Sequence, residues 1–248
     1  VDLFFGDIVF SSDSGTRTVT RYLSYTENQR KYIRLSGLRK VFSDHTYRHR
    51  FEYIVNKISL QGSPRRPDSV LVVCKIDNER EAKRIIDQFE VQTMNHTELR
   101  LFSDEIWDSE SFSEHKINNT NEIESHFFEE FLGPHQYLSV WNPEYSYGSN
   151  YLIDLCHATE YVENKAISKF IDTKADEGVM GDAKISEYRF VTEVPIFASL
   201  IPKKLIMNRP VIPNLRKWAQ LGHIQMDGFV IDDSEIVPSK LSFNKPFN

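Results

Sequence analysis

The segment at residues 69–76, SVLVVCKI, constrains the fold more than any other part of the chain. Its five consecutive apolar residues lack the polar alternation of a half-exposed strand and are typical of a strand buried on both faces. A helical pattern follows at residues 78–93, with Ala82, Ile85 and Phe89 on one face. A buried strand that leads into an amphipathic helix predicts a parallel sheet with helices packed against it.

The same alternation continues to the end of the chain and predicts an α/β fold with a mixed, mostly parallel, Rossmann-like sheet and helices on both faces. Gly222 is a natural stop for the last predicted helix. The expected strands cover residues 97–105, 137–141, 166–172, 187–201 and 223–231, and the expected helices cover residues 121–132, 150–164 and 212–222.

The first 60 residues have a different character and predict a separate helical appendage. A strand and turn are expected at residues 7–14, and two or three helices between residues 19 and 58. Residues 61–68 contain Gly62, Pro64 and Pro67 and are interpreted as a linker to a domain at 69–248. Residues 1–67 hold 12 Lys/Arg and 6 Asp/Glu, a net of +6, whereas the remainder holds 18 and 30, a net of −12. This acidic larger part argues against a nucleic-acid partner.

The two cysteines, Cys74 and Cys156, each lie in an apolar segment, which is typical of reduced, packed thiols and favours a cytoplasmic protein. No apolar run reaches the length of about 20 residues that a transmembrane helix needs. The chain opens on Val1 within an expected strand, from which we expect a piece of a longer polypeptide.

Residues 36–55, SGLRKVFSDHTYRHRFEYIV, resemble the closing helices of group-1 glycosyltransferases related to the spore maturation protein CgeB. In those proteins a small residue and a Gly precede a His-Thr-Tyr-x-x-Arg helix. The resemblance covers residues 1 to about 57. It implies that the appendage is the C-terminal tail of a GT-B-like domain.

Residues 68 to about 235 resemble family 2 glycosyltransferases, which have the GT-A fold. The first stretch that carries this resemblance runs from the buried strand through its helix to Gln92 and Thr93 and on to a second strand. The second stretch is YLSVWNPEYSYGSNYLIDL at residues 137–155, which ends in the family's Tyr-Gly-x-Asn-Tyr-Leu pattern. The resemblance implies a nucleotide-sugar transferase fold.

The family's acidic cluster, which binds a divalent metal, is degenerate here. The aspartates are replaced by Asn142, Pro143 and Glu144. Glu144 offers one carboxylate and Asn142 a weaker carbonyl oxygen, whereas Mn²⁺ or Mg²⁺ prefers several hard oxygen ligands. We therefore expect a metal that is weakly bound or absent.

The family's general base also departs from its pattern. The resemblance aligns its acidic pair with Pro213 and Asn214. The catalytic residue is therefore unknown, and the candidates are Asp182, Glu187 and Glu193.

The resemblance assigns Asp77, Glu79 and Asp104 to the nucleotide sugar. Trp141 is a further candidate, because an aromatic ring at a strand end can stack on a base or a sugar. The two carboxylates after the first strand also suit the start of a helix, where acidic residues are favoured. Asp104 is alternatively a solvated loop residue, and Trp141 a core side chain.

These features predict a glycosyltransferase-like protein of bacterial glycan or glycoconjugate synthesis. Its partners are then a nucleotide-sugar donor and a glycan or lipid-linked acceptor. The alternative is a catalytically inactive binding or scaffold module of a larger glycan-assembly protein. The fold alone does not decide between the two.

Overall fold

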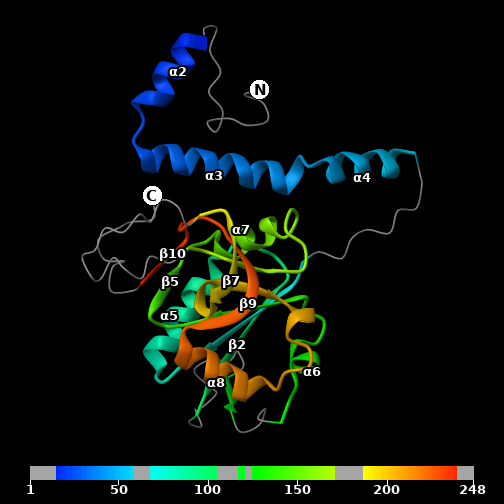
Figure 1. The fold of residues 1–248 in the computed structure, drawn as a ribbon, viewed down its shortest axis with the longest axis vertical. Helices are drawn as coiled ribbons and strands as arrows, with labels where there is room; N and C mark the ends of the chain where they lie inside the picture. The colour runs from blue at the N-terminus through cyan, green and yellow to red at the C-terminus, as the bar shows by residue number, and fades with distance from the viewer. Residues whose placement is uncertain (1–14, 59–67, 105–116, 121–124, 171–186, 239–248) are drawn as a thin grey trace. The chain divides into compact units, whose positions relative to one another are not determined.

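A computed structural model describes residues 15–58, 68–104, 117–120, 125–170 and 187–238 (Figure 1). The chain divides into two compact units, Val1–Arg66 and Pro67–Asn248. The strand and turn predicted at residues 7–14 lie outside the described residues, as does most of the predicted linker.

The first unit contains the helices α2 (Gly15–Ser24), α3 (Glu27–Asp44) and α4 (Tyr47–Lys57). Two capping boxes begin α3 and α4. Thr26 accepts from the backbone N–H of Gln29, and Thr46 does the same for His49, while each partner's side chain accepts from the cap residue's backbone N–H. The His-Thr-Tyr segment of the CgeB-like resemblance therefore forms a helix boundary here.

Within the described part of the second unit, eight strands form a sheet with the order β3-β2-β1-β4-β8-β6-β9-β7. Strand β1 lies between β2 and β4 and is parallel to both, which confirms the central position predicted from its apolar run. The strands β8 and β7 run against their neighbours. The strands are β1 (Val70–Lys75), β2 (Thr97–Ser103), β3 (Ile117–Asn119), β4 (Tyr137–Trp141), β6 (Ala166–Ser168), β7 (Arg189–Pro195), β8 (Ser199–Pro202) and β9 (His223–Val230).

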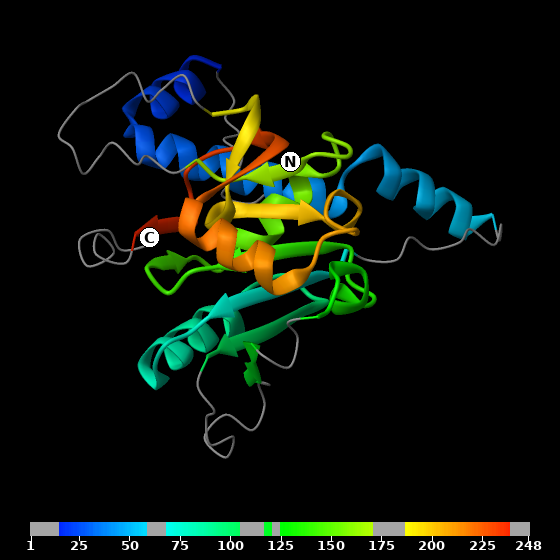
Figure 2. The ribbon, with the colours of Figure 1, turned by 60° about the horizontal axis from the view of Figure 1, so that its bottom comes forward.

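Helices cover both faces of this sheet. On one face, α5 (Glu79–Glu90) and α7 (Tyr151–Ala158) share a core that includes Ile85, Leu152 and Leu155. On the other face, α6 (Phe128–Leu132) and α8 (Val211–Leu221) share a second core (Figure 2). Phe128 of α6 stacks on Trp218 of α8 with 5.5 Å between ring centroids. The two cores account for the continuous apolar run of β1, which is buried on both sides.

The α/β fold with a mixed, mostly parallel sheet is therefore as the sequence predicted. Gly222 ends α8 in the left-handed conformation (φ 70°), also as expected. The strand expected at residues 187–201 was wrong, because a 3₁₀ turn at Ile196–Ala198 separates β7 from β8. Only residues 128–132 of the expected helix at 121–132 are α-helical in the described part. No helix among the described residues combines the length and apolarity that crossing a membrane requires.

Candidate functional site

Six strands of the sheet point the same way, so their carboxyl ends share one side of the molecule, which we call the carboxyl edge. It consists of the residues that close or directly follow β3, β2, β1, β4, β6 and β9. Cys74 of β1 is paired with both Leu101 of β2 and Trp141 of β4. The polar residues that follow these three strands therefore lie side by side, where open α/β sheets bind ligands.

Lys75 joins two of the three acidic residues that the sequence assigned to the nucleotide. Its Nζ lies 2.8 Å from Oδ2 of Asp104 and 3.6 Å from Oδ1 of Asp77. All three side chains are at least half exposed. The hydrogen bond between Lys75 and Asp104 raises the pKa of the ammonium and lowers the pKa of the carboxyl group. The edge therefore carries a mixed-charge cluster that is open to solvent.

Asp104 is the centre of this cluster. It also accepts a 2.7 Å hydrogen bond from the hydroxyl of Thr120, which follows β3. On its other side, a guanidinium nitrogen of Arg216 in α8 lies 4.0 Å from Oδ1. The sequence did not identify Lys75, Thr120 or Arg216, because their relation to Asp104 depends on strand order and on the placement of α8.

The start of α5 is organised by capping contacts. Asn78 Oδ1 accepts from the backbone N–H of Glu81, and the Glu81 carboxylate accepts from the Asn78 amide and from the backbone N–H of Asp77. Glu79 is the first residue of the helix and is exposed. Of the two acidic residues predicted here, only Asp77 has a described ion pair with Lys75.

The segment that the resemblance aligns with an acidic cluster is a β-turn. The backbone N–H of Tyr145 donates to the carbonyl oxygen of Asn142, and Pro143 occupies the second position, which suits its fixed φ. The side-chain oxygen of Asn142 accepts from the backbone N–H of Glu144 at 2.8 Å. This turn therefore already uses one of the two expected metal ligands.

The other expected ligand, Glu144, is exposed. In the part of the chain that the structure describes, no group of three or more His, Cys, Asp or Glu side chains is arranged to hold a metal ion. Mg²⁺ and Mn²⁺ take several oxygen ligands in octahedral sites. The residues of the turn do not fit such an ion, and no step below depends on one.

Trp141 closes β4 and belongs to the core, with 1% of its surface exposed. Its ring stacks on Tyr147 with centroids 4.2 Å apart and planes within 9°. Phe89 and Tyr151 meet it edge to face. This packing leaves neither face of the Trp141 ring open to a base or a sugar.

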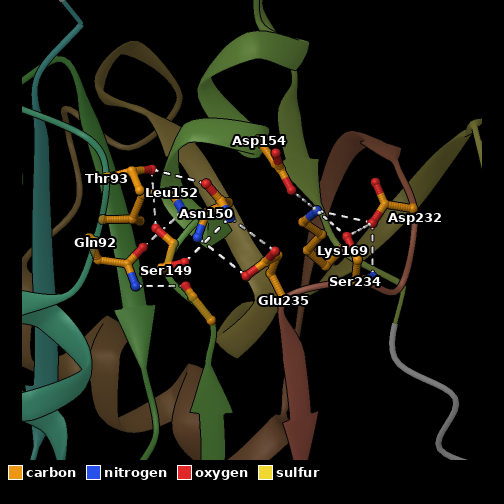
Figure 3. Close-up of polar contacts among 11 residues, drawn as sticks. Gln92, Thr93, Ser149, Asn150, Leu152, Asp154, Lys169, Asp232, Ser234 and Glu235 are labelled. Atoms are coloured by element: carbon orange, nitrogen blue, oxygen red, sulfur yellow. Dashed lines mark hydrogen bonds and ion pairs between the residues drawn. The ribbon is translucent and has the colours of Figure 1, made fainter. Parts of the chain in front are cut away.

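The two stretches that carry the family 2 resemblance bind each other (Figure 3). The Gln92 amide donates to the carbonyl oxygen of Gly148 at 2.8 Å and accepts from the backbone N–H of Leu152 at 3.2 Å. The backbone N–H of Thr93 donates to the carbonyl oxygen of Ser149 at 2.8 Å. In this chain, the Gln-Thr and Tyr-Gly-x-Asn-Tyr-Leu patterns hold the start of α7 against the end of α5.

A short ribbon secures the same region from the opposite side. Strand β10 (Ile236–Pro238) pairs antiparallel with β5 (Tyr145–Tyr147). Glu235, just before β10, accepts from the backbone N–H of Gly148 with its carbonyl oxygen. Its carboxylate accepts from the backbone and side-chain amides of Asn150. A Cβ at Gly148 would collide with this carboxylate, so the position admits only glycine without rearrangement.

A buried ion cluster lies farther along the carboxyl edge. Lys169 follows β6 and is fully buried, and its Nζ lies 2.9 Å from Asp154 of α7 and 3.1 Å from Asp232, which follows β9 (Figure 3). Ser234 also accepts from Lys169 and donates to Asp232. Burial by itself raises the pKa of Asp232, but Lys169 and Ser234 outweigh it and hold the pKa below its usual value.

The three candidate bases are in different situations. Asp182 lies outside the described residues. Glu193 is exposed in the middle of β7, where it pairs with Gln225, away from the carboxyl edge. Glu187 lies two residues before Arg189, the end of β7 that pairs with the carboxyl end of β9. It is therefore at the edge, though several strands from β1. The structure thus brings Asp77 and Asp104 together and separates them from every described candidate base.

The aligned acidic pair is also accounted for. Pro213 and Asn214 lie in the first turn of α8, and the Asn214 amide donates back to the carbonyl oxygen of Pro210 at 2.8 Å. Asn214 therefore stabilises the helix start, while Arg216 of the same helix reaches the edge.

No family model matches the chain, and no curated protein is significantly similar to it in sequence. Among solved structures, the chain is similar to S. aureus TarS, with 10% identity and a TM-score of 0.43, over 68% of this chain and 36% of TarS. TarS residues 1–349 with UDP and with UDP-GlcNAc give the same identity and TM-score, over 59% and 57% of those chains. The chain thus spans between one third and three fifths of these proteins. A likeness this distant does not bear on the site.

Proposed function

We propose that the carboxyl edge binds the nucleotide of a nucleotide-sugar donor, and that the chain transfers the sugar to an acceptor hydroxyl in glycan or glycoconjugate synthesis. The observation that carries this proposal is the contact of Lys75 with both Asp77 and Asp104. It brings together two exposed carboxylates and a cation at the ends of two central parallel strands, where ligands of such sheets bind.

Each group has a task in this proposal. The carboxylates of Asp77 and Asp104 accept hydrogen bonds from the ribose hydroxyls or the base N–H. Lys75 and Arg216, which now face Asp104, turn to the phosphates when the donor is bound. Two cations then stabilise the negative charge that develops on the leaving diphosphate, the task that a metal ion performs in related chemistry. An acidic side chain deprotonates the acceptor hydroxyl, and Glu187 and Asp182 both remain candidates.

A second candidate function is a catalytically inactive binding module. One observation favours it: the side chain of Asn142 completes a local turn instead of facing a ligand. The motif residues that the chain retains, such as Gln92 and Gly148, hold the backbone together. The family's chemically active carboxylates are the ones replaced. A module of this kind would bind the nucleotide and release no sugar.

Thermal unfolding with UDP, GDP and CMP, each with and without manganese, tests the binding step. A ligand that binds only the native state raises the melting temperature by mass action, by an amount set by the ratio of its concentration to its Kd. We expect one nucleoside diphosphate to raise the melting temperature without manganese. If none of the nucleotides has an effect in either condition, the proposed function is wrong.

Site variants then localise the binding. Asp77→Asn and Asp104→Asn should each weaken nucleotide binding by about tenfold, which is the loss of affinity expected for one hydrogen bond to a charged group. Asp87→Asn is the matched control, because Asp87 is an exposed aspartate on α5 that has no role in the proposed site. Release of sugar from the corresponding donor, followed by chromatography, separates a transferase from an inactive module.

A further inference from the structure

We propose that Glu235 and Lys169 are positioning residues, which together clamp the turn after β4 in the shape that the nucleotide site requires. The proposal rests on the proposed function of the carboxyl edge. Neither Glu235 nor Lys169 contacts the nucleotide. They act through a series of contacts that joins the buried ion cluster to Asn142.

The buried ion cluster is the fixed end of this series. Lys169 directly follows β6, and its backbone N–H donates to the carbonyl oxygen of Ala198, while Asp154 lies on α7, so neither moves without disturbing the core. Asp232 is held by Lys169, and it also accepts from the backbone N–H of Ser234 at 2.8 Å. The buried ammonium of Lys169 binds the buried carboxylates of Asp154 and Asp232. Such contacts hold the loop after β9 more tightly than solvent-exposed contacts would.

Glu235 transmits this anchoring to the turn. It directly follows Ser234 and has a φ of 65°, a conformation that is costly for a residue with a long side chain. In that conformation its carbonyl oxygen accepts from the backbone N–H of Gly148. Its carboxylate faces Asn150 (Figure 3). Backbone strain that persists beside a candidate site is expected where the surrounding contacts determine the shape.

The last contacts lead from Gly148 to the candidate site. Tyr147, which precedes Gly148, is paired with Ile236 in the β5–β10 ribbon. Its hydroxyl accepts from the backbone N–H of Asn142 at 2.9 Å and donates to the carbonyl oxygen of Phe197 at 3.0 Å. Asn142 is the first residue after β4, next in register to the end of β1, which bears Lys75. The position of the turn beside Lys75 thus depends on Tyr147.

The clamp is tested by Glu235→Ala in the whole chain, with Asp233→Ala as the control that removes the same charge from the same loop. Two measurements are made: hydrogen exchange at the amides of Gly148 and Asn150, and the Kd of the nucleotide identified by thermal unfolding. We expect faster exchange at both amides, unchanged exchange in β1, and a Kd raised about fivefold to tenfold. Asp233→Ala should change the Kd less than about twofold.

Gly148→Ala approaches the same contact from the other side. The new methyl group displaces the Glu235 carboxylate, so we expect a similar rise in Kd. Both substitutions remove the same contact between Gly148 and the Glu235 carboxylate. The double variant Gly148→Ala/Glu235→Ala should therefore bind the nucleotide no more weakly than the weaker-binding single variant. The stacked pair Trp141 and Tyr147 gives an independent signal, since near-ultraviolet circular dichroism should change in every variant that frees the turn.

Ser234→Ala tests the buried end without removing a charge. It should loosen the loop, speed exchange at Gly148 and Asn150, and raise the Kd in the same direction as Glu235→Ala. If exchange at the turn rises while the Kd stays constant, the positioning proposal is wrong and the proposed function stands. If the parent chain binds no nucleotide, the proposed function is wrong. If hydrogen exchange at Gly148 and Asn150 is unchanged in Ser234→Ala and Glu235→Ala, the positioning proposal is wrong as well.

Discussion

Lys75 closes β1 and Asp104 follows the neighbouring parallel strand β2, and the two exposed side chains meet at 2.8 Å. Replacing Lys75 by Met should weaken the binding of a nucleoside diphosphate by about tenfold. Binding of the nucleoside should hardly change, because the ammonium contacts the phosphates in this proposal. The free energy of unfolding should change by less than about 1 kcal/mol, since exposed ion pairs contribute little. Calorimetry with the diphosphate and the nucleoside measures both effects. Equal losses for the two ligands would contradict the role assigned to Lys75.

Lys169 should behave in the opposite way, because it is fully buried. Lys169→Met leaves Asp154 and Asp232 without their cation, and breaking a buried pair in this manner costs about 3–5 kcal/mol of unfolding free energy. Lys165→Met is the matched control, since Lys165 pairs with the exposed Asp227 at 3.2 Å, and it should cost less than about 1 kcal/mol. Urea unfolding measures the two values, and similar losses would rule out a special contribution from the buried cluster.

The buried cluster should also make the fold sensitive to acid. The pKa of Asp232 is lowered in the folded state, so its ionised form contributes stability above the unfolded value of about 3.9. That contribution is lost as the pH falls through the lower, folded pKa. The free energy of unfolding should therefore decline below about pH 4, and the decline should be shallower in Asp232→Asn. Urea unfolding between about pH 2.5 and 6 gives both curves, and parallel curves would contradict the assignment.

Metal binding at the turn remains a prediction. The carboxylate of Glu144 and the engaged side chain of Asn142 should give no micromolar affinity for manganese. Asn142→Asp should strengthen binding by about tenfold or more, because the new carboxylate can still accept from Glu144 and brings a second charge. Titration calorimetry of the parent and of Asn142→Asp checks this. A micromolar affinity of the parent that Glu144→Gln abolishes would overturn it.

Local pattern was sufficient to predict the elements that contain the site. The apolar run from Val70 to Cys74 determined that β1 is central, because only a strand covered on both faces can hide five consecutive apolar side chains. The resemblance of residues 137–155 located the turn after β4. Turn chemistry was visible as well, since Asn-Pro-Glu is a sequence that local hydrogen bonds and a fixed φ turn into a bend.

The partners of each site residue were beyond the reach of sequence reasoning. Asp104 was predicted as a nucleotide contact, but its neighbours Thr120 and Arg216 come from a third strand and from the far helix α8. Trp141 could be assigned to a ligand or to the core, and its stacking on Tyr147 depends on how β5 folds back. The candidate bases illustrate the same limit, because the pairing of β7 with β9 places Glu193 in the middle of the strand and leaves Glu187 before its start.

The sequence by itself thus located most of the strands and helices, since periodicity and caps act over a few residues, but it missed the 3₁₀ turn that divides residues 187–201. Tertiary structure alone decided where charges meet. Lys169 stands in an ordinary strand-and-loop segment, and nothing near it in sequence marks it as buried between two aspartates. Glu235 likewise becomes the clamp of Gly148 only when β10 pairs with β5. A buried charge is tolerable only with its partners in place, and the strand order brings those partners together from distant parts of the chain.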